Sequence, residues 1–148
     1  ELCENEAIAG TEEYAHSEKY EIKVREWNRP DSLREFVARI NAIRRGNPAL
    51  QQFANLRFLA TDNDQIILYC KSSADRSNVI LVAVNLDPHH PHHCTAFVPA
   101  DAVGTVPGQS YAVTDLLTGA RYDWGERNYI RLDPQIEPAH ILLVESRP

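Results

Sequence analysis

The spacing of apolar residues changes from helical to strand-like near residue 50. Before that point an apolar stripe recurs at intervals of three and four positions, which places its members on one side of a helix. The stripe consists of Leu33, Phe36, Val37, Ile40 and Ile43. Ser32 and Glu35 form a capping box at the start of this helix. The breakers Gly46, Asn47 and Pro48 end it.

Eight short runs with the two-residue period of strands follow. They cover Asn55–Thr61, Gln65–Lys71, Asn78–Leu86, Cys94–Pro99, Ser110–Leu117, Ala120–Trp124, Asn128–Leu132 and His140–Glu145. Within the third run, Ile80–Val84 is apolar throughout, which is typical of a central strand covered on both faces. Turn residues such as Thr118-Gly119 separate the runs. Many short strands joined by tight turns predict a mainly-β domain, an antiparallel sandwich or barrel.

The first 30 residues are polar, acidic and aperiodic. Such a segment buries too little apolar surface to offset the entropy of ordering its chain. We therefore expect a loop, or a segment held by something outside this sequence. The helix raises the same question, because its apolar stripe needs a surface to cover it. An upstream domain would supply both.

Composition places the chain among ordinary globular domains. It has 148 residues, of which 43% are apolar and 24% are charged, and a chain of this size can build a core without disulfides or metal. The formal net charge of −6 argues against nucleic acid and anionic membrane as partners. No apolar run approaches the ~20 residues that span a bilayer. No signal peptide is recognisable either.

Two further features bear on origin and compartment. The chain contains no methionine, so we expect it to be a piece of a longer protein. Its three cysteines, Cys3, Cys70 and Cys94, are odd in number and widely spaced, which fits neither a disulfide framework nor a zinc motif. We therefore expect reduced thiols and a cytoplasmic protein.

Two groups of residues resemble parts of metal or catalytic sites. The run His89-His90-Pro91-His92-His93-Cys94 contains ligands that suit transition metals, but consecutive side chains rarely converge on one tetrahedral site. Glu4 and Glu6 are one candidate pair of carboxylates for glycoside hydrolysis, and Glu12-Glu13 is another. No apolar surroundings fix the geometry of either pair or raise a pKa there. We predict no catalytic residue, no cofactor and no bound metal for this chain.

Aromatic residues offer a different function. Trp124 and Tyr129 could stack on sugar rings, although aromatic residues on strands more often belong to a core. The sequence contains no Gly-x-Ser-x-Gly elbow, phosphate-binding glycine loop or dinucleotide-binding fingerprint. A carbohydrate-binding module therefore remains an open alternative.

Several strings in a fixed order resemble one enzyme family. They are Glu1-Leu2-Cys3-Glu4-Asn5-Glu6, Ser17-Glu18-Lys19-Tyr20-Glu21, Ile43-Arg44-Arg45, Asn47-Pro48-Ala49-Leu50, Asn85-Leu86-Asp87-Pro88-His89-His90-Pro91, and Asp115-Leu116-Leu117-Thr118-Gly119 followed by Trp124 and Asn128-Tyr129. Together they run along nearly the whole chain. The ordered set resembles the C-terminal end of α-1,4-glucan:maltose-1-phosphate maltosyltransferases, which belong to the α-amylase superfamily.

The resemblance implies a layout. Residues 1–50 would be the last strand end, loop and helix of a (β/α)₈ catalytic barrel, and residues 51–148 would be a C-terminal antiparallel β-sandwich. The helix stripe would then face the missing part of the barrel, or fold onto the sandwich without it. The implied parent reaction is the transfer of maltose from maltose 1-phosphate to an α-1,4-glucan with retention. The family's catalytic aspartate and glutamate come from earlier barrel strands.

One pair of residues matches a family contact to the donor. Lys19-Tyr20 resembles the pair that contacts the donor phosphate, and an ammonium and a phenol hydroxyl can both donate hydrogen bonds to phosphate oxygens. The leading hypothesis is a non-catalytic C-terminal fragment of a cytoplasmic α-glucan-synthesising enzyme, inactive alone, whose sandwich stabilises the barrel. The alternatives are an α-glucan-binding module built on Trp124 and Tyr129, and a metal protein built on His89–Cys94.

Overall fold

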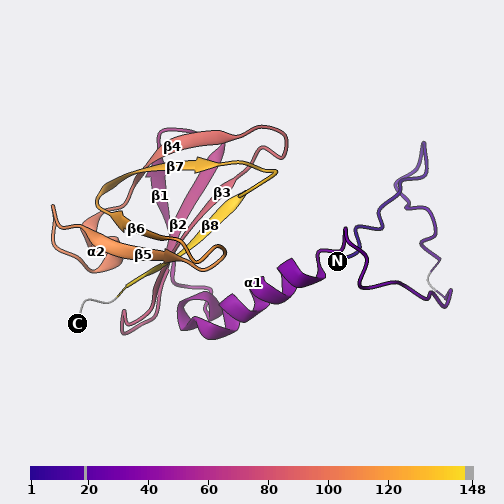
Figure 1. Ribbon diagram of the computed structural model, residues 1–148, viewed down its shortest axis with the longest axis horizontal. Coiled ribbons are helices and arrows are strands. Elements are labelled where there is room, and N and C mark those ends of the chain that lie inside the picture. The colour runs from indigo at the N-terminus through magenta and orange to yellow at the C-terminus, as the bar shows by residue number, and fades with distance from the viewer. Residues whose placement is uncertain (19, 146–148) are drawn as a thin grey trace. The chain divides into compact units, whose positions relative to one another are not determined.

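A computed structural model describes residues 1–18 and 20–145, and its elements are those of a mainly-β chain (Figure 1). The helical elements are α1 (Arg34–Gly46), the 3-10 turn η1 (Pro48–Gln51) and α2 (Ala100–Val103). The strands are β1 (Leu56–Thr61), β2 (Ile66–Ser72), β3 (Val79–Asn85), β4 (His92–Phe97), β5 (Tyr111–Asp115), β6 (Arg121–Trp124), β7 (Arg127–Leu132) and β8 (Ala139–Val144). The chain divides into two compact units, Glu1–Ala42 and Ile43–Pro148.

The expected helix is α1, and its ends follow the sequence signals. It begins at Arg34, whose backbone N–H donates to the Ser32 hydroxyl at 3.2 Å. Arg44 and Arg45 occupy the last turn, where cations offset the helix dipole. The helix buries none of its residues, and Phe36 in its apolar stripe is 48% exposed. The stripe is therefore not buried within its own unit.

All eight expected strands are present, and antiparallel pairing joins them into one sheet. Their order across the sheet is β6-β5-β8-β3-β2-β1-β4-β7. β1 is the junction, because its first four residues pair with β2 whereas Ala60 and Thr61 pair with β4. β4 and β7 contribute to the same buried core as β2, β3 and β8, and form the second layer (Figure 1). The predicted antiparallel β-sandwich is confirmed.

The interior between the layers is filled from both sides. Its buried residues are Ile66, Leu68, Cys70, Val79, Leu81, Ala83, Cys94, Ala96, Val98, Val103, Tyr111, Val113, Trp124, Ile130, Leu132, Leu142 and Val144. In β2, β4, β5, β7 and β8 alternate residues point inward, as the two-residue period of β-structure requires. Trp124 at the end of β6 is only 6% exposed, so this aromatic ring belongs to the core.

The central strand β3 is covered on both faces. Leu81 belongs to the sandwich interior, while Ile80 joins Ala49 of η1 in a second buried cluster on the other face. Asn78 holds η1 in place, since its side-chain oxygen accepts the Ala49 N–H at 3.1 Å. The apolar run Ile80–Val84 thus occupies the doubly covered strand that the sequence predicts.

The sequence does not predict η1 or α2. Each contains four residues, which is too few to display a helical period. Across the part of the chain that the structure describes, every helix is too short or too polar to span a membrane.

Trp124→Ala should lower the free energy of unfolding by about 3–5 kcal/mol, because it leaves a cavity between the two layers. Tyr129→Ala on β7 is the matched control. Tyr129 is 70% exposed, so its loss should change the same free energy by only about 0.5 kcal/mol. Urea unfolding of both variants measures the difference, and equal losses would contradict the burial of Trp124.

Candidate functional site

The pair that resembles a donor-phosphate contact lies in the irregular segment before α1. Lys19 lies outside the described residues. Tyr20 is 83% exposed, and its backbone N–H donates to Glu18 Oε1 at 3.3 Å. Among the described residues before α1, strand pairing is limited to an isolated bridge between Ala7 and Tyr14. The segment is therefore the expected loop, and the role of Lys19 and Tyr20 stays a prediction.

Ion pairs close this segment on itself. Arg25 Nε donates to Glu4 Oε2 at 2.7 Å, and Arg29 Nε lies 2.9 Å from Asp31 Oδ1. The hydrogen bond from Arg25 lowers the pKa of Glu4, whereas an acid catalyst needs a raised one. Exposed ion pairs contribute only about 0–1 kcal/mol each. These contacts therefore do not replace an apolar scaffold for the segment.

An open hollow of about 920 Å³ lies within the same segment. Its lining includes Glu6, Glu18 and Lys23, together with Ile22 and Val24. The last two side chains are 96% and 99% exposed. Neighbouring apolar side chains this exposed are typical of a surface that another part of a protein covers.

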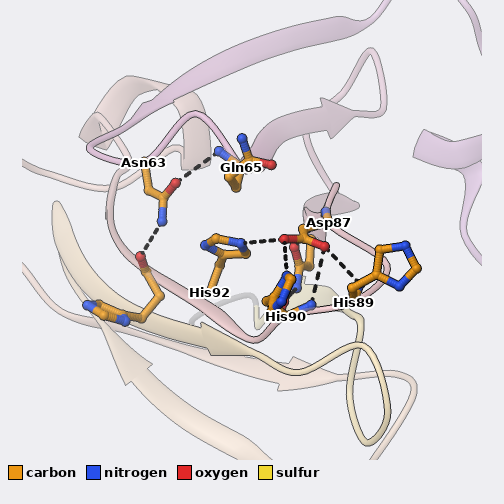
Figure 2. A network of polar contacts seen from close by, with 8 residues as sticks. Asn63, Gln65, Asp87, His89, His90 and His92 are labelled. Carbon is orange, nitrogen blue, oxygen red and sulfur yellow. Dashed lines mark hydrogen bonds and ion pairs between the residues drawn. The ribbon is translucent and has the colours of Figure 1, made fainter.

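The histidine-rich turn after β3 is organised by the carboxylate of Asp87 (Figure 2). Its Oδ1 accepts the backbone N–H groups of His89 at 2.8 Å and of His90 at 3.2 Å. Its Oδ2 lies 2.9 Å from His90 Nδ1 and 3.1 Å from His92 Nε2. These contacts, led by the bond from the His89 N–H, hold the pKa of Asp87 well below its usual range. The ionised carboxylate thus fixes both backbone and side chains of the turn.

A second set of bonds ties this turn to the turn between β1 and β2. Asn63 Nδ2 donates to the His93 carbonyl at 2.9 Å, and Asn63 Oδ1 accepts the Gln65 N–H at 2.9 Å (Figure 2). Asn85 Nδ2 donates to the His90 carbonyl at 2.9 Å. Side chains here satisfy backbone groups that the strand ladder does not reach. Asn85 and Asp87, which precede the histidines, were the sequence signal for this ordered turn. Asn and Asp side chains commonly form hydrogen bonds with the backbone of their own turn.

Cys94 does not join these histidines as a metal ligand. It is 2% exposed within the sandwich core, and burial raises the pKa of its thiol to about 11. Its side chain is therefore enclosed in the core and not available beside the histidines. The alternation of β4 explains the separation, because His93 points outward and its neighbour Cys94 inward. A metal site on His89–Cys94 would therefore lack its thiol ligand.

Trp124 and Tyr129 do not form one sugar-binding surface. Trp124 is buried between the layers, whereas Tyr129 lies on the outside of β7. The Tyr129 ring packs near that of His93, with centroids 6.0 Å apart and an interplanar angle of 33°. Of the two aromatic residues in the alternative of a carbohydrate-binding module, only Tyr129 is therefore exposed for contact with a sugar.

Comparison with known proteins decides the family. The family described as "GLGE, C-terminal" matches residues 58–144. The chain belongs to this family. It is 48% identical over 145 residues to α-1,4-glucan:maltose-1-phosphate maltosyltransferase of Rhodospirillum rubrum, covering 97% of this chain and 21% of the relative. It is 44% identical over 153 residues to the protein of that name from Corynebacterium glutamicum, covering 100% and 23%.

The chain spans about a fifth of the length of these curated relatives. A solved structure, the noncanonic maltogenic α-amylase AmyB from Thermotoga neapolitana, matches 79% of this chain and 27% of its own, with a TM-score of 0.55 and 14% identity. At that identity the likeness speaks for the fold alone. It agrees with the C-terminal β-sandwich that the resemblance implies.

Asp87→Asn should destabilise the folded chain in a pH-dependent way. Because the folded-state pKa of Asp87 is depressed, its contribution is fully present above about pH 4, the ordinary pKa of aspartate, and is lost as pH falls toward the folded-state value. Thermal unfolding between about pH 7 and pH 2 measures the gap between wild type and variant. His89→Ala is the control, since Asp87 accepts the backbone N–H of His89 and not its ring. A gap that stays constant with pH would contradict the prediction.

Proposed function

We propose that this chain is the non-catalytic C-terminal part of a cytoplasmic α-glucan-synthesising enzyme. The intact enzyme transfers maltose from maltose 1-phosphate to an α-1,4-glucan, the reaction for which its relatives are named. Within that enzyme the sandwich covers and stabilises the catalytic barrel. The observation that carries the proposal is an apolar face on the outside of the sandwich.

This outer face extends over adjacent strands of the larger layer. Its apolar residues are Leu56 and Phe58 of β1, Tyr69 of β2, Val82 and Val84 of β3, and Ile141 and Leu143 of β8. Phe58 is 64% exposed and Leu56 is 45% exposed. The Phe58 ring meets the Tyr69 ring edge-on, with centroids 6.4 Å apart. A contiguous group of apolar side chains therefore faces outward from this layer.

Antiparallel sheets that face water alternate apolar inward positions with polar outward ones. The outer face of this sandwich departs from that rule, and exposed apolar patches of this kind mark interaction surfaces. The stripe of α1 is a second such surface, with Leu33 46% and Phe36 48% exposed. One partner would account for both surfaces, namely the catalytic barrel of the same polypeptide, since the chain spans only about a fifth of its relatives' length.

The proposed layout assigns residues 1–50 to the last strand end, loop and helix of the barrel, and residues 51–148 to the C-terminal sandwich. The barrel supplies the catalytic aspartate and glutamate. Lys19 and Tyr20 donate hydrogen bonds to the donor phosphate in the intact enzyme. The free thiols Cys3, Cys70 and Cys94 fit a reducing cytoplasm.

A functional assay tests the non-catalytic assignment directly. The isolated chain is incubated with maltose 1-phosphate and a maltooligosaccharide, and we expect neither maltosyl transfer nor glucan hydrolysis. The full-length enzyme is the positive control. Transfer by the isolated chain would overturn the assignment, because the residues that it contains would then suffice for catalysis.

Phe58→Ser should destabilise the full-length enzyme much more than the isolated chain. In the isolated chain the side chain is 64% exposed, so the free energy of unfolding should change by about 0.5 kcal/mol or less. In the full-length enzyme the same change should cost about 1.5–3 kcal/mol, because the barrel buries the ring. Thermal unfolding of both proteins measures the effect.

Val106→Ser provides the matched control for Phe58→Ser. Val106 is 60% exposed and lies in the loop between α2 and β5, away from the outer face of the sheet. The Val106→Ser substitution should leave the thermal stability of both proteins unchanged. Equal effects of Phe58→Ser in the two proteins would mean that the barrel does not cover this face.

A further inference from the structure

A cluster of three potential ligands lies where β5 ends beside β8. Asp115, Glu137 and His140 each offer one ligand atom, and these three atoms all lie within 4.8 Å of one another. Asp115 is completely buried, His140 is 8% exposed, and the Glu137 side chain is 30% exposed. Pairing of β5 with β8 brings these residues together from different parts of the chain (Figure 1).

One imidazole proton cannot satisfy both carboxylates. His140 Nδ1 lies 2.7 Å from Asp115 Oδ2 and 3.3 Å from Glu137 Oε1. A ring nitrogen carries a single hydrogen, and the shorter distance assigns it to Asp115. Glu137 Oε1 is buried and has no hydrogen-bond partner among the described residues. A buried carboxylate oxygen without a donor is costly, and a cation beside it would offset that cost.

The fold holds the three donors in place. Asp115 Oδ1 accepts the Leu117 N–H at 2.8 Å, which directs Oδ2 toward His140. Glu137 exchanges two backbone hydrogen bonds with Asp133, of 2.8 and 3.0 Å, in the turn between β7 and β8. His140 is part of β8. Ligands held this way are preorganised for an ion.

We infer that Asp115, Glu137 and His140 form a binding site for a divalent first-row transition ion such as Zn²⁺. Two carboxylates and one imidazole suit Zn²⁺ better than Ca²⁺ or Mg²⁺, which take mainly oxygen ligands. The ion takes the position of the hydrogen on His140 Nδ1, and the neutral ring keeps its hydrogen on Nε2. It enters past the partly exposed Glu137 and links β5 to the turn before β8.

Glu137→Gln is the decisive variant, because Glu137 lies in a turn and its replacement keeps the shape of the side chain. The chain is stripped with a chelator and titrated with ZnCl₂ by calorimetry. Wild type should bind Zn²⁺ and gain thermal stability. Glu137→Gln should weaken binding at this site at least about tenfold, since outer-shell changes alone cost 10–100-fold. CaCl₂ should produce no such response.

Two controls separate this site from other sources of binding. Glu12→Gln makes the same change of charge in the exposed N-terminal segment and should behave as wild type. The double variant His89→Ala/His93→Ala removes exposed imidazoles of the histidine turn and should retain the site at Glu137. Failure of the wild-type chain to bind Zn²⁺, equal binding by Glu137→Gln, or loss of binding in the histidine double variant would each overturn the inference.

Discussion

The structure depends on the burial of β3 on both of its faces. An apolar run such as Ile80–Val84 is stable only where each face meets another layer. The inner face is covered by the chain itself, since β1 passes from β2 to β4 and so places β4 and β7 over the interior. The outer face is covered only in part, by η1 and its neighbours. The outer face of the larger layer is therefore incompletely covered.

This incompletely covered outer face connects the fold to its proposed role. Phe58 and Leu56 extend the outer apolar face to solvent, and the stripe of α1 is exposed as well. The segment before α1 is held by ion pairs such as Glu4–Arg25, which are too weak to serve as a scaffold. These features support the proposal that the chain is part of a larger enzyme, in which the sandwich would cover the catalytic barrel.

Two aspartates show how polar groups are used in this fold. Asp87 is on the surface, and four contacts to backbone and imidazole groups satisfy its carboxylate. Asp115 is buried and accepts the single Nδ1 hydrogen of His140, which leaves none for Glu137. The first arrangement is complete by hydrogen bonds alone, whereas the second leaves a buried oxygen of Glu137 without a donor. The number of hydrogen-bond donors around the carboxylates therefore distinguishes the structural turn at Asp87 from the proposed metal-binding cluster at Asp115.

The sequence by itself determined the local structure. It predicted the helix from its stripe, and all eight strands from their two-residue period, because both signals depend on neighbouring residues only. Tertiary structure decided which aromatic residue is core, since Trp124 and Tyr129 carry the same strand signal yet only Trp124 lies between the layers. It also turned Cys94 away from the histidines. Asp115 and His140 are 25 positions apart, and only long-range strand pairing brings them into contact, because register is set by the packing of whole layers and not by local pattern.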